Sequence, residues 1–368
     1  MFDYLRDCKC VVFLIGFITY SLTCKCQGIA YTKEQLVIDT NYSINLRDEV
    51  RLIGSFIAPS NALPILIIVS PPLTPDRDLP TNSTPGGMVK YLALQIARFG
   101  YGVFWFDNRG MGKSEGTADS ATLYSHAADV QEIFGAIKKQ NPNSKVGLLG
   151  LSEGGAASEV VVSQNTNIAF LILLSVQGLS GYDFSKYQTK NMFDQKGQLF
   201  NQKQLIDSMY REYDLLSQDL YAILEKHDDV DTIKHLFRER ILGNEDSTPS
   251  RVSHYQRQVK IGILEAWSTP QQLVLRKFKP SQFLSKVRCP LLVVCGDRDE
   301  QVDCDRNLEQ IKTVVTRSNH PNASFVKLEG VNHQYQTLKP GSWEAVDRNE
   351  TFSQAGLDAI TSWLLKIR

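Results

Sequence analysis

The chain has 368 residues with 40 Lys and Arg against 40 Asp and Glu, so its formal net charge is zero at pH 7. This balance argues against nucleic-acid binding driven by phosphate contacts, because such proteins carry an excess of basic residues. Hydrophobic residues make up 42% and charged residues 22% of the chain, which excludes a largely disordered protein. The length fits one α/β domain with an insertion as well as two small domains.

The first 26 residues differ from the rest and predict a secretory signal peptide. Arg6 and Lys9 precede a short apolar run at 11–22, and small residues follow it. The run is shorter than the roughly 20 residues that a membrane-spanning helix needs, and no later stretch approaches that length. We therefore expect residues 1–26 to be cleaved and residues 27–368 to form a secreted protein without a membrane span. An uncleaved anchor is the alternative.

The cysteines and glycosylation sequons are compatible with secretion. Cleavage of the leader would leave Cys289, Cys295 and Cys304. Cys289 and Cys295 bound one predicted strand and lie too far apart to bridge at about 3.3 Å per residue, whereas a Cys295–Cys304 disulfide is possible. Sequons begin at Asn41, Asn82, Asn322 and Asn349.

Short apolar runs alternate with amphipathic helical patterns along most of the chain. The runs predict strands over 50–58, 65–70, 102–106, 146–149, 168–175, 291–295 and 324–328. The helical patterns predict helices over 89–99, 122–139, 153–163 and 354–366. This alternation is typical of an α/β fold, a mostly parallel sheet with helices on both faces.

The alternation breaks between about 178 and 287, where the sequence is polar, charge-rich and helical. We predict a helical cap insertion over the carboxyl edge of the sheet, because ligands of open α/β sheets bind beyond that edge. A surface subdomain without a role in substrate binding is the alternative.

The segment 150–155 reads Gly-Leu-Ser-Glu-Gly-Gly and lies between a predicted strand and a predicted helix. A G-x-S-x-G sequence in this context predicts a sharp turn that exposes Ser152 at the sheet edge as a nucleophile. Gly150 and Gly154 are needed because a side chain there would clash with the neighbouring strand or helix. A serine hydroxyl is a weak nucleophile, so Ser152 needs a base that a third group orients.

The chain order of serine, then acid, then histidine predicts the partners of Ser152. His333 follows the strand 324–328, whereas the other histidines precede Ser152, lie in the predicted cap or precede a proline in a polar loop. The acid is expected after the strand 291–295. Asp299 is our choice there, and the alternatives are Asp297, Glu300 and Asp303, of which Asp297 could instead cap the turn.

The backbone N–H of Glu153 is expected to stabilise an oxyanion together with a second N–H after the strand 65–70. Pro71 and Pro72 have no N–H, so Leu73 or Thr74 is the nearest second donor. The Gly-containing run at 107–116 does not match a P-loop, because Asp107 occupies the first glycine position, and we interpret it as a structural turn. We predict neither a cofactor nor a metal, because no metal-ligand cluster is visible in the sequence.

Several segments of the chain resemble the α/β-hydrolase superfamily and, more narrowly, the bacterial EstD-type carboxylesterases, often labelled serine aminopeptidase-like hydrolases. The matching segments are 50–54 with Pro59, 76–78, 106–114, 150–155, 295–302 with Asn307 and Leu308, and 332–336. The resemblance implies an α/β-hydrolase fold and a triad of Ser152, Asp299 and His333, and it places Asp299 ahead of Asp297. This chain departs from the family at Leu151, where the family has His, and at 71–73, where it has a Gly-Ser-Gly-type oxyanion loop.

These observations predict a secreted serine hydrolase that cleaves small-molecule carboxylic esters through an acyl-enzyme. The alternatives are a peptidase or aminopeptidase of the same fold, a thioester hydrolase or acyltransferase, and a binding protein without catalytic activity. No nucleic-acid partner is expected.

Overall fold

The computed structural model describes residues 37–58, 64–80, 86–119, 121–200, 203–242, 251–342, 345–347 and 349–368. The predicted leader at 1–26 and the sequon at Asn82 lie outside these residues. Within the described part, no helix combines the length and the hydropathy needed to cross a lipid bilayer.

The strands of the described residues form one eight-stranded sheet. In spatial order they are β1 (Val37–Asn45), β2 (Arg51–Ala58), β4 (Gly102–Phe106), β3 (Pro64–Val69), β5 (Lys145–Leu151), β6 (Leu171–Leu174), β7 (Leu291–Gly296) and β8 (Ala323–Leu328). β2 is antiparallel to β1 and β4, and all neighbours from β4 to β8 are parallel. β3, β4, β6 and β7 are buried along their whole length, as expected of central strands covered on both faces.

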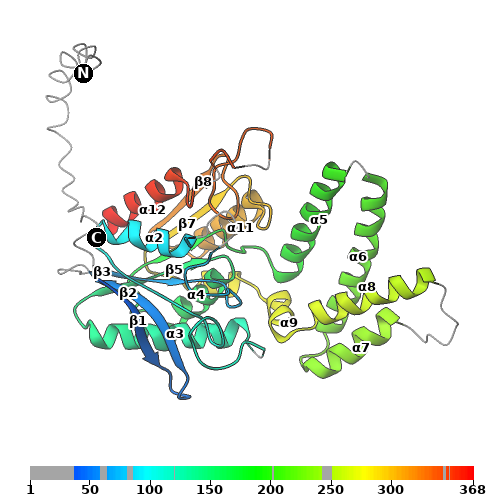
Figure 1. Cartoon of the computed structure of the whole chain (residues 1–368), viewed down its shortest axis with the longest axis horizontal. Coiled ribbons are helices and arrows are strands. Elements are labelled where there is room, and N and C mark those ends of the chain that lie inside the picture. The colour runs from blue at the N-terminus through cyan, green and yellow to red at the C-terminus, as the bar shows by residue number, and fades with distance from the viewer. Residues whose placement is uncertain are drawn as a thin grey trace, which may run out of the picture.

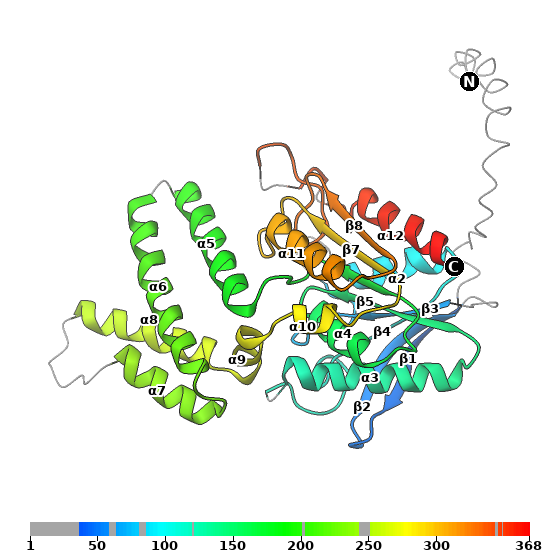
Figure 2. The same cartoon turned by 180° about the vertical axis from the view of Figure 1, so that it is seen from behind.

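Helices cover both faces of the sheet (Figures 1 and 2). α2 (Met88–Ala97) and α12 (Gln354–Ile367) pack on one face, and α3 (Leu123–Gln140), α4 (Glu153–Gln164) and α11 (Cys304–Arg317) pack on the other. Their apolar sides form two separate cores, one on each face of the sheet. The predicted α/β class, with a mostly parallel sheet between two helical layers, is thus confirmed.

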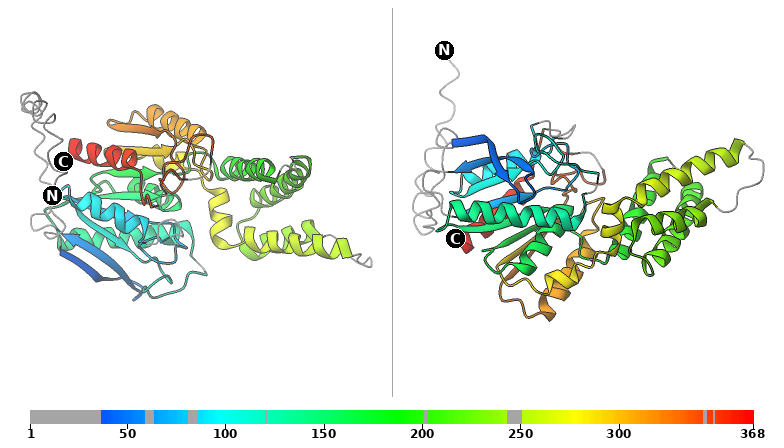
Figure 3. Two further views of the ribbon diagram at one scale, coloured as in Figure 1. Left: turned by 45° about the horizontal axis from the view of Figure 1, so that its top comes forward. Right: turned by 90° about the horizontal axis from the view of Figure 1, so that it is seen from below.

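Five helices between β6 and β7 form a helical insertion that stands beside the sheet (Figure 3). They are α5 (Gly181–Phe200), α6 (Lys203–Leu224), α7 (Val230–Leu242), α8 (Arg251–Trp267) and α9 (Pro270–Lys277). The insertion has its own apolar core, in which Leu220, Phe237 and Trp267 are buried. The short helix α10 (Ser281–Leu284) follows, and Leu284 belongs to the core of the sheet. The helical insertion therefore spans 181–277, less than the sequence pattern covers.

The two ends of the helical insertion lie side by side. The N–H of Gly181 donates to the carbonyl oxygen of Phe278 at 2.8 Å. Just before the insertion, the side-chain oxygen of Asn307 on α11 accepts from the N–H groups of Gly178 at 2.8 Å and Leu179 at 3.2 Å. Both ends are thus fixed at the carboxyl edge of the sheet, where β6 ends.

Candidate active site

Ser152 occupies a sharp turn between β5 and α4. Its φ of 49° lies in the left-handed region that residues with a side chain rarely adopt. A Cβ on Gly150 would lie 2.4 Å from Cα of Gly155, and a Cβ on Gly154 would lie 2.1 Å from the carbonyl oxygen of Val69. The close approach of α4 to β3 and β5 therefore requires glycine at both positions. The turn holds Ser152 at the N-terminus of α4, at the carboxyl end of β5.

Asp299 and His333 contact each other on two loops at the same sheet edge. Asp299 follows β7 and His333 follows β8, and the parallel strands bring both loops together. Nδ1 of His333 lies 2.9 Å from each carboxylate oxygen of Asp299. One of these oxygens also accepts from the backbone N–H groups of Gln301 at 2.9 Å and Val302 at 2.8 Å. The carboxylate is fully buried and is held in one orientation.

The surroundings of His333 shift its pKa in opposite directions. Burial lowers the pKa, because the charged imidazolium is poorly solvated, while the charge and hydrogen bond of Asp299 and the charge of Glu300 raise it. The net result is a pKa above the ordinary value of 6.5. His333 is thus a stronger base than a free histidine.

The other acidic residues considered for this site have different contacts. Asp297 accepts from the N–H of Gly330 at 2.7 Å, across the turn after β8. Asp303 caps α11 by accepting from the N–H of Arg306 at 3.0 Å. Glu300 accepts from the backbone N–H of His333 at 3.4 Å, not from its ring. Asp299 is the one of the four whose carboxylate is hydrogen-bonded to the imidazole.

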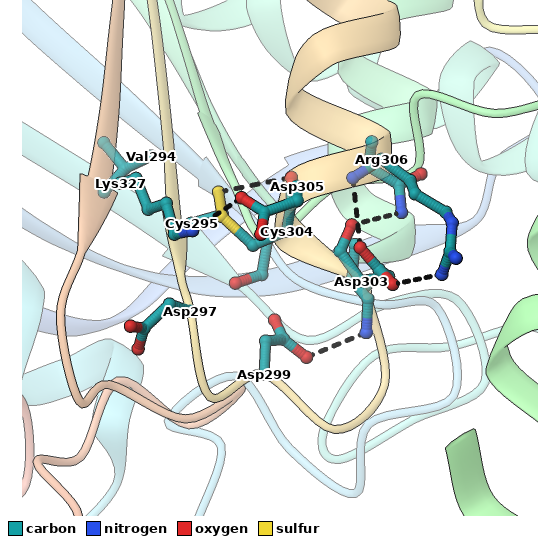
Figure 4. Close-up of a disulfide and its surroundings, with 12 residues drawn as sticks. Val294, Cys295, Asp297, Asp299, Asp303, Cys304, Asp305, Arg306 and Lys327 are labelled. Atoms are coloured by element: carbon teal, nitrogen blue, oxygen red, sulfur yellow. Dashed lines mark hydrogen bonds and ion pairs between the residues drawn. A yellow bond between two sulfur atoms is a disulfide. The ribbon is translucent and has the colours of Figure 1, made fainter.

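A disulfide between Cys295 and Cys304 closes the loop that carries Asp299 (Figure 4). Cys295 lies in β7 and Cys304 begins α11, with their Cα atoms 5.6 Å apart. Cys289 is free, and burial raises the pKa of its thiol to about 12. The disulfide fixes both ends of the Asp299 loop by a covalent bond.

The loop after β3 carries the predicted second oxyanion donor. The N–H of Thr74 donates to the carbonyl oxygen of Pro71 at 3.3 Å, so that group is already engaged. The N–H of Leu73 has no acceptor among the described residues, and its side chain is exposed. The N–H of Glu153 lies in the first turn of α4, where backbone N–H groups have no partner within the helix. Leu73 and Glu153 both remain candidate donors.

Arg77 anchors this loop to the sheet. Its backbone N–H and its Nη1 donate to the two carboxylate oxygens of Asp107 at 2.6 and 2.7 Å. Its Nε donates to Ser55 at 2.9 Å and its Nη2 to the carbonyl oxygen of Thr40 at 2.8 Å. Asp107 also accepts from the N–H of Lys113 at 2.9 Å. The run 107–116 thus has a structural role, as the sequence interpretation expected.

A cavity of about 340 Å³ connects Ser152 with the helical insertion. Its lining includes Ser152 from the turn before α4, Glu153 from α4, Phe184, Tyr213, Trp267 and Arg276 from the insertion, and Gln301 and Val302 from the Asp299 loop. The carboxyl group of Glu153 accepts from Nε2 of Gln271 on α9 at 2.9 Å. Burial raises the pKa of Glu153, and this hydrogen bond offsets part of the rise.

The structure thus brings Asp299 and His333 into contact and places Ser152 at the same sheet edge. No hydrogen bond joins Ser152 to His333, and neither His333 nor Leu73, although both are described, lines the cavity. The sequence did not single out Gln271 or Arg276, because the positions of these residues depend on where α9 packs and not on a local pattern. In the described residues, no group of three or more His, Cys, Asp or Glu side chains is placed to hold a metal ion.

Part of the chain matches a protein family. Residues 85–260 match the family model described as serine aminopeptidase, S33. The match includes Ser152 and ends before Asp299 and His333. No curated protein matches the sequence.

Solved structures of two esterases share the fold of this chain. The esterase Pf2001 of Pyrococcus furiosus superposes with a TM-score of 0.52 at 14% identity, over 91% of this chain and 96% of that chain. Est1E from Butyrivibrio proteoclasticus, solved with ferulic acid, superposes with a TM-score of 0.50 at 16% identity, over 88% of this chain and 98% of that chain. The similarity extends over almost the whole architecture and concerns the fold.

Proposed function

Because the chain has the α/β-hydrolase fold, we propose that it is a serine hydrolase that cleaves carboxylic esters of small molecules. The observation that carries this proposal is the 2.9 Å contact between Nδ1 of His333 and Asp299, at the sheet edge where the glycine-bounded turn presents Ser152. The match to a hydrolase family model across Ser152 supports it.

In the proposed reaction, Oγ of Ser152 attacks the ester carbonyl carbon while Nε2 of His333 accepts the serine proton. Nδ1–H of His333 donates to Asp299, whose charge stabilises the imidazolium that forms. The N–H groups of Glu153 and Leu73 donate to the oxyanion. The imidazolium then protonates the leaving alcohol, and the acyl group stays on Ser152. His333 next takes a proton from water, whose oxygen attacks the acyl carbon. The imidazolium then returns the proton to Oγ of Ser152 as the bond between Oγ and the acyl carbon breaks and the acid leaves.

We also propose that the protein is secreted and glycosylated. Residues 1–26 have the pattern of a signal peptide, and the sequon asparagines Asn41, Asn322 and Asn349 are exposed. The Cys295–Cys304 disulfide suits an oxidising compartment. A secreted product that starts after the leader and loses mass on treatment with an N-glycosidase is the expected result. Retention in the cytosol would contradict this part of the proposal.

A peptidase is the second candidate, because the matching family model is described as serine aminopeptidase. A peptidase would use the same nucleophile on an amide instead of an ester. Aminoacyl arylamides beside aryl esters therefore separate the two functions.

The test measures hydrolysis of short-chain aryl esters and of aminoacyl arylamides by the purified protein and two serine variants. Ser152→Ala removes the proposed nucleophile, and its matched control, Ser163→Ala, removes a hydroxyl at the far end of α4 that, among the described residues, donates only to the carbonyl oxygen of Val160. We expect ester turnover that Ser152→Ala lowers by at least about 10³-fold and Ser163→Ala leaves intact. Turnover of arylamides alone would favour the peptidase. A folded protein that hydrolyses neither, or retains activity in Ser152→Ala, would contradict the serine hydrolase.

A further inference from the structure

Arg276 on α9 is a buried arginine without a carboxylate partner. Its side chain lies in the insertion, and the residue is only 7% exposed. Nη1 donates to the hydroxyl of Ser185 at 2.9 Å, and the guanidinium carbon lies 4.4 Å from the ring centroid of Trp267. Nε is buried and has no hydrogen-bond partner. Across the ranges that the structure describes, no Asp or Glu forms an ion pair with Arg276.

Two other arginines with limited exposure each have a carboxylate partner. Arg77 is paired with Asp107 at 2.7 Å, and Arg109 is paired with Asp129 at 2.6 Å. An arginine side chain stays protonated in proteins, so its burial is unfavourable unless a negative charge lies close by. Stacking on Trp267 orients the guanidinium and attracts it weakly but does not neutralise it. Arg276 therefore lacks the counter-charge that Arg77 and Arg109 have.

The position of Arg276 indicates where that counter-charge could bind. Arg276 and Ser152 line the same cavity of about 340 Å³, a volume near the lower end of small-molecule sites, which span about 300–1,000 Å³. Glu153 is the acidic side chain in the lining, but it accepts from Gln271 and is not paired with Arg276. A small anionic molecule bound at Ser152 is placed to supply the missing negative charge.

We propose that Arg276 binds a carboxylate carried by the ester substrate, so that the enzyme prefers anionic esters to neutral ones. This inference rests on the proposed ester hydrolysis and names the substrate class of the same site. The planar guanidinium matches the geometry of a carboxylate, and hydrogen bonds between two charged groups are stronger than those between neutral groups. The small cavity limits the substrate to a short acyl or alcohol group beside that carboxylate.

Two pairs of esters test the preference, each pairing a carboxylate with a primary amide of nearly the same shape. 4-Acetoxybenzoate and 4-acetoxybenzamide differ on the alcohol side, and monoethyl adipate and ethyl 6-amino-6-oxohexanoate differ on the acyl side. For each pair the measured quantity is the ratio of kcat/KM for the anionic ester to that for the neutral ester. We expect a ratio of at least about ten in one pair, from the strength of hydrogen bonds to charged groups. The pair that shows it tells which part of the ester Arg276 contacts.

Three variants assign the preference to Arg276. Arg276→Gln should lower the ratio at least about tenfold, while Arg276→Lys, which keeps a positive charge without the planar fork, should retain part of it. The matched control is Lys279→Gln, which removes an exposed cation three residues away that does not line the Ser152 cavity. It should leave the ratio unchanged. Melting temperatures of all variants check that each one is folded.

Calorimetric binding of adipate and of 4-hydroxybenzoate gives a readout that does not depend on turnover. We expect Ser152→Ala to bind one of these anions and the double variant with Arg276→Gln to bind it at least about tenfold more weakly. Hydrolysis of neutral esters without an anionic preference, or a preference that Arg276→Gln leaves intact, would overturn this inference but not the proposed function. Failure to hydrolyse any ester would overturn the proposed function, and the binding measurement would then decide whether Arg276 holds an anion.

Discussion

Replacing Asp299 with asparagine tests the assignment of the acid most directly. The Oδ1 of the new side chain could still accept from the N–H groups of Gln301 and Val302, which lie 2.9 and 2.8 Å from Oδ1 of Asp299. Its amide NH₂ would then face Nδ1 of His333, which lies 2.9 Å from the second oxygen of Asp299. Oδ1 also lies 2.9 Å from Nδ1, but the new NH₂ group can only donate and opposes a proton on Nδ1. The variant therefore favours the tautomer in which Nδ1 accepts and the ring proton is on Nε2.

A ring protonated on Nε2 cannot take the proton of Ser152. Serine hydrolases whose triad aspartate is replaced in this way lose about 10⁴-fold in kcat, because the histidine adopts the wrong tautomer. We expect a loss of this size in Asp299→Asn at pH 7.5, with little change in melting temperature, because the variant keeps the two backbone hydrogen bonds.

The matched control is Asp297→Asn, two residues earlier in the same loop. Asp297 accepts from the N–H of Gly330 at 2.7 Å, and the oxygen of an asparagine could accept that bond equally well. We therefore expect Asp297→Asn to keep kcat/KM within about threefold of the wild type, a difference below 1 kcal/mol.

The pH profile of kcat/KM adds a second readout. In the wild type, activity should rise with pH around a midpoint above 6.5, because the net effect of burial, Asp299 and Glu300 raises the pKa of His333 and the neutral imidazole is the base. In Asp299→Asn the midpoint of the residual activity should fall below that of the wild type. Equal losses in the two asparagine variants, or an unshifted midpoint, would refute the assignment of Asp299 as the acid.

Three further predictions concern stability. Asp107→Asn should lower the free energy of unfolding by about 3 kcal/mol in urea titrations at pH 7.5, because it leaves the buried charge of Arg77 unpaired, and a loss below about 1 kcal/mol would contradict this. Burial lowers the pKa of His126 to about 4, so native stability should fall as the pH drops from 6.5 to 4, where the unfolded chain binds the proton more readily. His126→Leu should reduce this fall in stability between pH 6.5 and 4, and an unchanged fall would contradict the prediction. Burial raises the pKa of Glu159 well above 4.5, because the buried side chain is more stable in its neutral form. The stability that neutral Glu159 contributes to the fold is therefore complete below pH 4.5 and is lost as the pH rises. Glu159→Gln should therefore stabilise the protein more at pH 8 than at pH 5, and an equal effect at both would refute this.

The sequence predicts the central strands well because their burial on both faces requires continuous apolar runs. β1 is not predicted, because an irregularity in its pairing between Asp39 and Tyr42 interrupts the alternation of polar and apolar residues. α11 is also missed, because its sequence is mostly polar and its buried apolar positions, among them Leu308, Ile311 and Val315, are few.

The sequence narrows the candidate site to a few residues but does not distinguish among all of them. A glycine-bounded serine between a strand and a helix has a recognisable local pattern, since the close contacts of its glycines act over a few residues. Asp297 and Asp299 lie in the same loop and have the same side chain. They differ in their partners, because the folded path of the loop places Asp297 next to Gly330 and Asp299 next to His333. Arg276 has no local pattern at all, because whether an arginine has a counter-charge depends on the helices packed around it.

The place of the helical insertion in the chain has a consequence for folding during synthesis. Ser152 and the strands up to β6 precede the insertion, whereas β7, β8, Asp299 and His333 follow it. β6 therefore has an unpaired edge until Leu291 and its neighbours arrive, and such edges favour aggregation of unfinished chains. An insertion that folds early brings its two ends together, as the bond from Gly181 to Phe278 shows, and shortens the loop that must close before β7 can pair. For the proposed serine hydrolase, hydrolytic competence would be the last property that the growing chain acquires.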